Sequence, residues 1–143
     1  MAQDYKTHRQ IVPGFHYLTG SLILVCLIGS IVNLVNSFSD HGNLYSASLI
    51  VVMNIILLLV GLYARSFALK AQDRAIRAEE NLRHFVITGK LLDKRLRTGQ
   101  IIALRFAEDE EFVELAQKAA IENMRANDIK KAIKTWREDH HRV

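Results

Sequence analysis

Histidines are the first side chains to consider for chemistry, because imidazole binds metals and transfers protons near neutral pH. The 143-residue chain has six of them, at positions 8, 16, 41, 84, 140 and 141. They lie far apart along the sequence, and none belongs to an HExxH or H-x3-H pattern. The adjacent His140 and His141 would point to different sides of a helix. We therefore expect no metal site and no cofactor.

Other reactive residue types do not combine into a catalytic set. Thr88-Gly89-Lys90 resembles part of a phosphate-binding loop, but it lacks the preceding strand and the first glycine, which favours a helix end. Asp109-Glu110-Glu111 are consecutive carboxylates, and consecutive residues of a helix do not face each other. The single Cys26 lies in an apolar stretch and excludes a disulfide framework. We expect a non-enzymatic protein.

The distribution of charge divides the chain into two parts. Between Gln10 and Ala64 the only charged side chain is Asp40, although the chain carries 19 Lys and Arg and 15 Asp and Glu. The charges after residue 64 are of both signs and interleaved, and no nucleic-acid-binding motif accompanies them. Nucleic acid is therefore not an expected partner.

Two apolar runs, residues 17–38 and 44–64, predict membrane-spanning helices. Roughly 20 apolar residues of helix cross the hydrocarbon core of a bilayer, and a helix satisfies its own backbone polar groups there. A soluble protein would have to bury both runs in a core that this short chain does not supply. A cleaved signal peptide is disfavoured, because the first run is too long and a second follows at once.

Basic residues predict that both termini are cytoplasmic. Lys6 and Arg9 precede the first run, whereas the connecting loop, residues 39–43, contains neither Lys nor Arg. Four basic residues that follow the second run are also candidates for contact with lipid headgroups. They are Arg65, Lys70, Arg74 and Arg77.

Small and polar residues inside the two runs predict packing between membrane helices. These residues are Cys26, Ser30, Asn33, Asn36, Asn54 and Gly61. Cys26, Ser30 and Asn33 recur on one face together with Ser37. Asn54 lies at the middle of the second run, where we expect a hydrogen bond near Gly29 and Ser30. The alternative is a polar path for an ion or substrate, which would need an oligomer.

The second helix is expected to continue to residue 88, since helix-forming residues follow without a break until Gly89. Two columns of residues, spaced seven apart, contain no charged side chain. Column a is Ala47, Asn54, Gly61, Ala68, Ala75 and Leu82. Column d is Ile50, Leu57, Ala64, Ala71, Ala78 and Phe85. The 3–4 spacing predicts a helix–helix seam, with Ala68, Ala71, Ala75, Ala78, Leu82 and Phe85 beyond the membrane.

The sequence does not determine which helices pack against this seam. The first span and the C-terminal helices of the same chain could cover it. Alternatively, a second copy of the chain could pack along it in a parallel homo-oligomer, an arrangement favoured by a seam that outruns the first span.

Short helices are expected after Gly89, and no strand pattern occurs. Thr98 is a candidate cap of one helix that reaches Phe106, and Asp109 starts the next with carboxylates in its first turn. Asn127 is a candidate cap of a last helix, over about residues 128–137, that carries Trp136. This basic, amphipathic helix could dock on its own domain, lie on a membrane surface or bind a partner.

Several blocks of sequence carry a family resemblance. They are Tyr5-Lys6-x-His8-Arg9 and residues 68–77, 79–85, 99–107 and 128–137. Together they resemble a family of small, uncharacterised bacterial two-span membrane proteins, defined as a domain of unknown function. The resemblance implies a multi-pass protein of the bacterial inner membrane and transfers no activity.

The expected protein is all-α, with a two-helix transmembrane hairpin, a second helix extended into the cytoplasm and a small helical C-terminal domain. The expected divisions are residues 1–16, 17–38, 39–43, 44–64, 65–88 and 89–143. We expect a non-enzymatic membrane protein that presents its helical domain for protein interaction or regulation. Its expected partners are the lipid bilayer, a second copy and a cytoplasmic protein. The alternative is a small transporter or channel subunit with an Asn-lined path.

Overall fold

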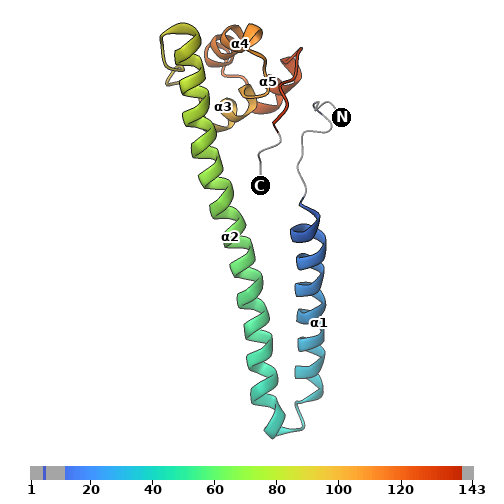
Figure 1. Ribbon diagram of the computed structural model, residues 1–143. Helices are drawn as coiled ribbons and strands as arrows, with labels where there is room; N and C mark the ends of the chain where they lie inside the picture. The colour runs from blue at the N-terminus through green and yellow to red at the C-terminus, as the bar shows by residue number, and fades with distance from the viewer. Residues whose placement is uncertain (1–4, 6–11, 140–143) are drawn as a thin grey trace. The chain divides into compact units, whose positions relative to one another are not determined.

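The computed structural model describes residue 5 and residues 12–139, and this part of the chain is α-helical (Figure 1). A π-helix, η1 (Gly14–Thr19), leads into α1 (Gly20–Asn36) and then α2 (His41–Thr88). Three shorter helices follow, α3 (Thr98–Leu104), α4 (Asp109–Ile121) and α5 (Ala126–Ala132). The described residues contain no strand, only an isolated bridge between Ala107 and Trp136. The all-α prediction is confirmed.

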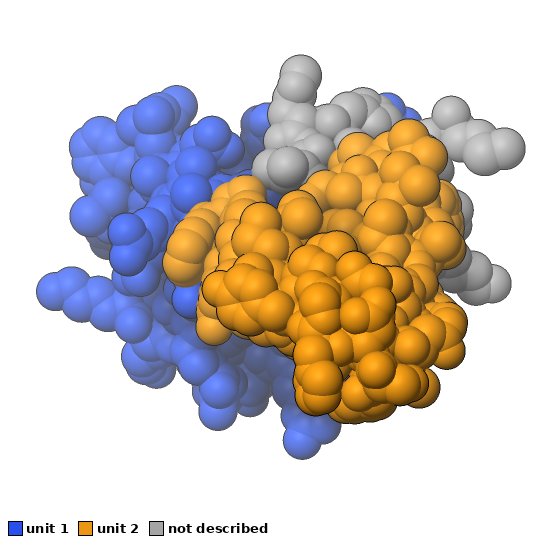
Figure 2. Space-filling model, turned by 90° about the horizontal axis from the view of Figure 1, so that it is seen from below, with its two compact units in different colours: residues 1–10, 69–143 blue, residues 11–68 orange. Residues whose placement is uncertain are grey.

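The chain divides into two compact units, residues 11–68 and residues 1–10 with 69–143 (Figure 2). Helix α2 contributes to both units as one helix of 48 residues, about 72 Å long at 1.5 Å per residue. Two helical segments, Gly14–Asn36 and His41–Thr88, are long and apolar enough to cross a membrane. The predicted continuation of the second apolar run to residue 88 is confirmed.

Asp40, the only charged residue of the apolar stretch, immediately precedes α2 and caps its start. Its carboxylate accepts a hydrogen bond from the backbone N–H of Gly42 at 3.0 Å and a second from the side chain of Asn43. A carboxylate at this position satisfies a backbone donor that has no partner within the helix, and it also suits the positive end of the helix dipole. The four residues 37–40 complete the connection from α1.

The C-terminal helical cluster, α3 to α5, surrounds a continuous apolar core. Its largest fully buried side chains are Phe106, Phe112, Ile101, Leu104 and Ile129. Helix α4 begins at Asp109, as predicted, and buries one face of its amphipathic pattern. The buried residues of α4 are Phe112, Leu115, Ala116, Ala119 and Ala120.

The last helix is shorter than the sequence suggested. Helix α5 ends at Ala132, so the prediction that Trp136 lies on it was wrong. Trp136 instead pairs with Ala107, with Arg137 N–H donating to the Phe106 carbonyl at 2.8 Å. The Glu111 carboxylate accepts the N–H groups of residues 134 and 135. These distant partners satisfy backbone groups that a longer helix would have paired internally.

The residues after α4 dock on their own cluster. Ile129 and Ile133 are buried in the core, and the ring of Trp136 lies 5.1 Å from that of Phe106. The sequence left open whether the last helix docks on its own domain, lies on a membrane surface or binds a partner. In the structure it docks on its own domain.

Two predicted helix caps were also wrong. Thr98 is the first residue of α3, whose cap is Arg97, and Asn127 lies in the first turn of α5, whose cap is Arg125. In α3 the side chain of Gln100 accepts the Arg97 N–H at 2.7 Å. The Gln100 side chain, in the first turn of α3, therefore provides a hydrogen bond at the helix start that Thr98 was expected to cap.

Replacing Phe112 by alanine should lower the free energy of unfolding of the cluster by about 3–5 kcal/mol, because it removes a fully buried ring and leaves a cavity. Unfolding of the full chain in detergent can be followed by the fluorescence of the single tryptophan, Trp136, which packs against the core. Ile121→Ala is the control, since Ile121 is 72% exposed. Equal shifts for the two variants would contradict this account of the core.

Candidate functional site

The residues of α2 beyond position 68 place one face against the C-terminal helical cluster. Ile76, Glu80 and His84 recur every four residues and are all buried. Two of the three are ionisable, so this junction needs specific polar partners to compensate for their burial. In heptad terms, with Ala75 at a and Ala78 at d, these residues occupy the outer b, c and f positions.

Arg83 supplies the main polar connection of the junction. It donates from Nη2 to the Ala107 carbonyl at 2.7 Å and from Nε to Oδ1 of Asp109 at 2.7 Å. Its third contact is Nη1 to Glu80 Oε2 at 3.1 Å. The guanidinium also lies 4.3 Å from the ring centroid of Phe112. One side chain thus ties α2 to the start of α4 and to the segment before it.

The acidic partner of Arg83 on its own helix is Glu80. Sequence spacing favours a pair with Glu79 four residues earlier, whereas the structure pairs Arg83 with Glu80 three residues earlier. Both spacings are sterically accessible on a helix. Glu80 is the carboxylate on the buried face, and Arg83 turns inward to reach Ala107 and Asp109 as well.

Glu80 is a buried carboxylate with a perturbed pKa. Burial raises its pKa above the usual 4.5, while the charge and hydrogen bond of Arg83 act in the opposite direction. Arg137 and Arg105 also favour the charged form, more weakly. Burial is the larger effect, so the protonated form is favoured relative to an exposed glutamate.

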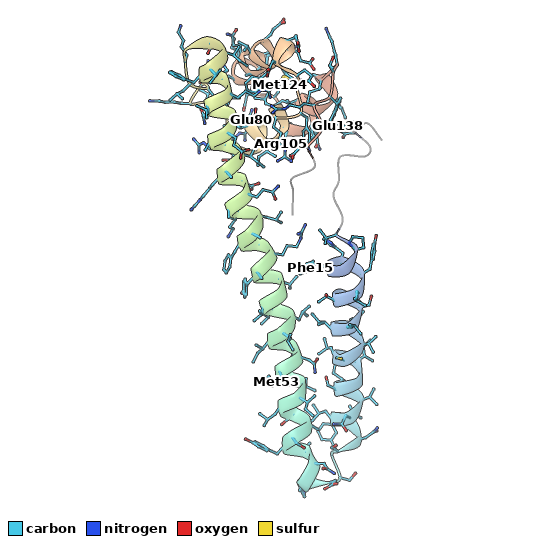
Figure 3. All side chains as sticks on the ribbon, in the orientation of Figure 1. Phe15, Met53, Glu80, Arg105, Met124 and Glu138 are labelled. Atoms are coloured by element: carbon cyan, nitrogen blue, oxygen red, sulfur yellow. The ribbon has the colours of Figure 1, made fainter. Side chains whose placement is uncertain are left out.

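A charged cavity of about 410 Å³ adjoins Glu80. Helix α2 contributes Gln72, Ala75, Ile76, Glu79 and Glu80 to its lining, and the later segments contribute Arg105, Arg137, Glu138 and Asp139. Figure 3 labels Glu80, Arg105 and Glu138 at this place. Arg105 forms an ion pair with Asp139 at 3.1 Å. Within the described residues, no group of three or more His, Cys, Asp or Glu side chains could hold a metal ion.

His84 stabilises the end of α2. Its Nδ1 lies 2.7 Å from the Lys90 carbonyl, and the Thr88 hydroxyl donates to the His84 carbonyl at 2.7 Å. Gly89 follows with φ +72°, a conformation that glycine adopts without strain. The interpretation of Thr88-Gly89-Lys90 as a helix end is therefore confirmed.

The predicted seam residues have different degrees of exposure. Every residue of column d is exposed, from Ile50 through Leu57, Ala64, Ala71 and Ala78 to Phe85. In column a, Ala47 is buried, then Asn54, Gly61 and Ala68 are half-buried, and finally Ala75 and Leu82 are exposed. The C-terminal helical cluster therefore does not cover the seam beyond residue 70, because it packs on the outer face of α2.

The small and polar residues of α1 differ in exposure, including the four that share one face, Cys26, Ser30, Asn33 and Ser37. Ser30 and Ser37 are buried, whereas Cys26, Asn33 and Asn36 are exposed. Ser30 donates to the Leu27 carbonyl of its own helix at 2.8 Å.

Asn54 also bonds within its own helix. Its side-chain N–H donates to the Ile50 carbonyl at 2.9 Å, so this donor is satisfied without the partner near Gly29 and Ser30 that the sequence suggested. Such a bond to the carbonyl four residues earlier lets a polar side chain remain in an apolar environment at low cost.

The basic residues after the second apolar run differ in exposure. Arg65 is half-buried, and its guanidinium lies 5.7 Å from the ring centroid of Phe15. Lys70, Arg74 and Arg77 are exposed.

These features define an all-α protein with two helices able to cross a membrane, the second of which continues into a folded helical cluster. The chain belongs to a protein family of unknown function, DUF6526, whose model matches residues 1–143. The resemblance to a family defined as a domain of unknown function is thereby confirmed. No curated protein and no solved structure matches the chain.

Replacing Arg83 by methionine should destabilise the junction by about 3–5 kcal/mol, since it leaves the buried Glu80 carboxylate without its ion-pair partner. Trp136 fluorescence during denaturation measures this loss. Arg95→Met is the matched control, because Arg95 forms a comparable 2.7 Å ion pair with Asp93 at an exposed site. An Arg83→Met transition that overlaid that of Arg95→Met would refute the anchoring role.

Replacing Glu80 by glutamine should change the pH dependence of stability. Because the folded pKa of Glu80 is raised, its contribution to stability is complete below pH 4.5 and declines as pH rises through the folded pKa. Glutamine does not titrate. As pH rises above 4.5, the wild-type melting temperature should therefore fall relative to that of Glu80→Gln. Parallel pH profiles for the two proteins would argue against a raised pKa.

Proposed function

We propose that this chain is a non-enzymatic integral membrane protein that presents its C-terminal helical cluster to a protein partner in the cytoplasm. The observation that carries the proposal is the apolar surface of residues 14–64. Leu24, Val25, Val52 and Leu62 are each at least 50% exposed and lie on different sides of their helices. Water would solvate such a surface unfavourably, whereas lipid tails match it.

A hairpin of α1 and α2 is supported by their less exposed faces and their short connection. On α1 this face includes Leu27, Ser30 and Leu34, and on α2 it includes Ala47 and Val51. Small residues such as Ser30 and Ala47 let two membrane helices approach closely. With only residues 37–40 between them, the two spans run in opposite directions through the bilayer.

The distribution of basic residues supports cytoplasmic termini. Arg65 follows the second apolar run and lies over the ring of Phe15, near the start of η1. Such pairs of an aromatic ring and a cation are typical of the membrane interface. The exposed Lys70, Arg74 and Arg77 follow within a few turns, where anionic headgroups would attract them.

Exposed apolar side chains beyond the membrane support an interaction role. Val86, Leu91 and Ile121 are each more than 60% exposed, in a part of the chain that is otherwise rich in charge. Surfaces of this kind are typical of protein interaction sites. Because α2 is continuous, a partner bound there would act on the same helix that crosses the bilayer.

The topology can be tested with single cysteines in a Cys26→Ala background. Ser39→Cys lies in the predicted outer loop, and Lys94→Cys follows α2; both positions are exposed. A membrane-impermeant maleimide should label Ser39→Cys on intact cells and Lys94→Cys only after lysis. Labelling of Lys94→Cys on intact cells, or equal labelling of both variants, would contradict the proposed orientation.

A further inference from the structure

We propose that residues 71–85 of α2 are the interface at which a second copy of this chain pairs in parallel, as a two-stranded coiled coil. The inference rests on the proposed function, because insertion in a membrane gives both copies the same orientation. The interface consists of Ala71, Ala75, Ala78, Leu82 and Phe85, which we call the α2 dimer face.

The α2 dimer face is apolar and open to a partner. Leu82 is 62% exposed and Phe85 is 50% exposed. Ala71, Ala75 and Ala78 are exposed as well. A face with two large apolar side chains and three alanines permits close approach of a second helix and buries apolar area in doing so.

The C-terminal helical cluster packs mainly on the opposite side of α2, although Ala75 at the edge of the dimer face also borders the charged cavity. Ile76, Glu80, Arg83 and His84 at the b, c and f positions hold the cluster. In a coiled coil these positions point outward, and the a and d positions meet the partner. Each copy can therefore keep its cluster on the outside while the two α2 helices pack together.

Charges beside the face match a second copy in parallel. Arg74 occupies a g position and Glu79 the following e position, and both are exposed. In a parallel pair a g residue faces the e residue five positions later in the partner. Arg74 of each copy would thus face Glu79 of the other, which forms two attractive pairs. This self-complementarity identifies a second copy, rather than an unrelated helix, as the occupant.

The exposed column d extends the contact toward the membrane. Its residues Ile50, Leu57 and Ala64 are exposed and in line with Ala71 and Ala78. Column a is partly covered in this region, so the two copies would approach each other there along column d alone. The closest contact is expected beyond residue 70, where both columns are exposed.

Cysteine cross-linking in the Cys26→Ala background tests the geometry in native membranes. Oxidation should convert Ala78→Cys to a disulfide-linked dimer, because d positions of parallel helices lie across from each other. Arg77→Cys is the control, since it is exposed on the same turn but lies about 100° around the helix. Equal cross-linking of both variants, or none for Ala78→Cys, would overturn the proposal. If maleimide labelling still reports the predicted topology, the proposed membrane arrangement survives that result.

Charge reversal tests the orientation and the identity of the partner. Arg74→Glu and Glu79→Arg should each weaken self-association roughly tenfold, because each makes both cross-pairs repulsive. Co-expressed with different tags, the two variants should pair with each other as strongly as wild type, since their mixture restores two attractive pairs. Failure of the mixture to recover would overturn the proposal. Trp136 fluorescence verifies folding of both variants, because Glu79 also borders the charged cavity.

Discussion

Each residue of a helix can face only one environment, and this constraint governs α2. Along 48 residues the helix carries an apolar surface suited to lipid, a face for its own C-terminal cluster and an exposed apolar face. The heptad positions divide these tasks. Outer positions hold Glu80, Arg83 and His84, while the a and d positions beyond residue 70 remain exposed. In the proposed dimer, the same division keeps the cluster and the second copy from competing for one surface.

Arg83 sets which face the cluster occupies. Its guanidinium reaches the Ala107 carbonyl, Asp109 and Glu80, so three parts of the chain share one cation. A buried ion pair contributes less to stability than its Coulomb energy suggests, because desolvation of both groups opposes it. Its contribution here is geometric, since Arg83 holds α2 against Asp109 and the Ala107 carbonyl at once. With the cluster on this face, Leu82 and Phe85 are exposed.

Features set by local sequence could be predicted, and features set by distant contacts could not. The end of α2 at Gly89 and the start of α4 at Asp109 follow from backbone preference and the helix dipole. Asp109 lies 26 residues beyond Arg83, so no local spacing revealed their contact. The early end of α5 has the same cause, because Trp136 pairs with Ala107 rather than with its own helix. The sequence did contain one sign of the face that contacts the cluster, the four-residue spacing of Ile76, Glu80 and His84. That set mixes apolar and ionisable residues, so it does not stand out as a buried face.

The most direct test of parallel pairing through α2 is the distance between spin labels on two copies in lipid vesicles. In one sample the label is at Ala64, at the end of the second apolar run. In the other sample it is at Ala78, beyond that run. Parallel α2 helices, with axes about 8–10 Å apart, should give short distances between copies at both positions. Short distances at neither position, or at Ala64 alone, would contradict a continuous α2 that pairs in parallel through its exposed face.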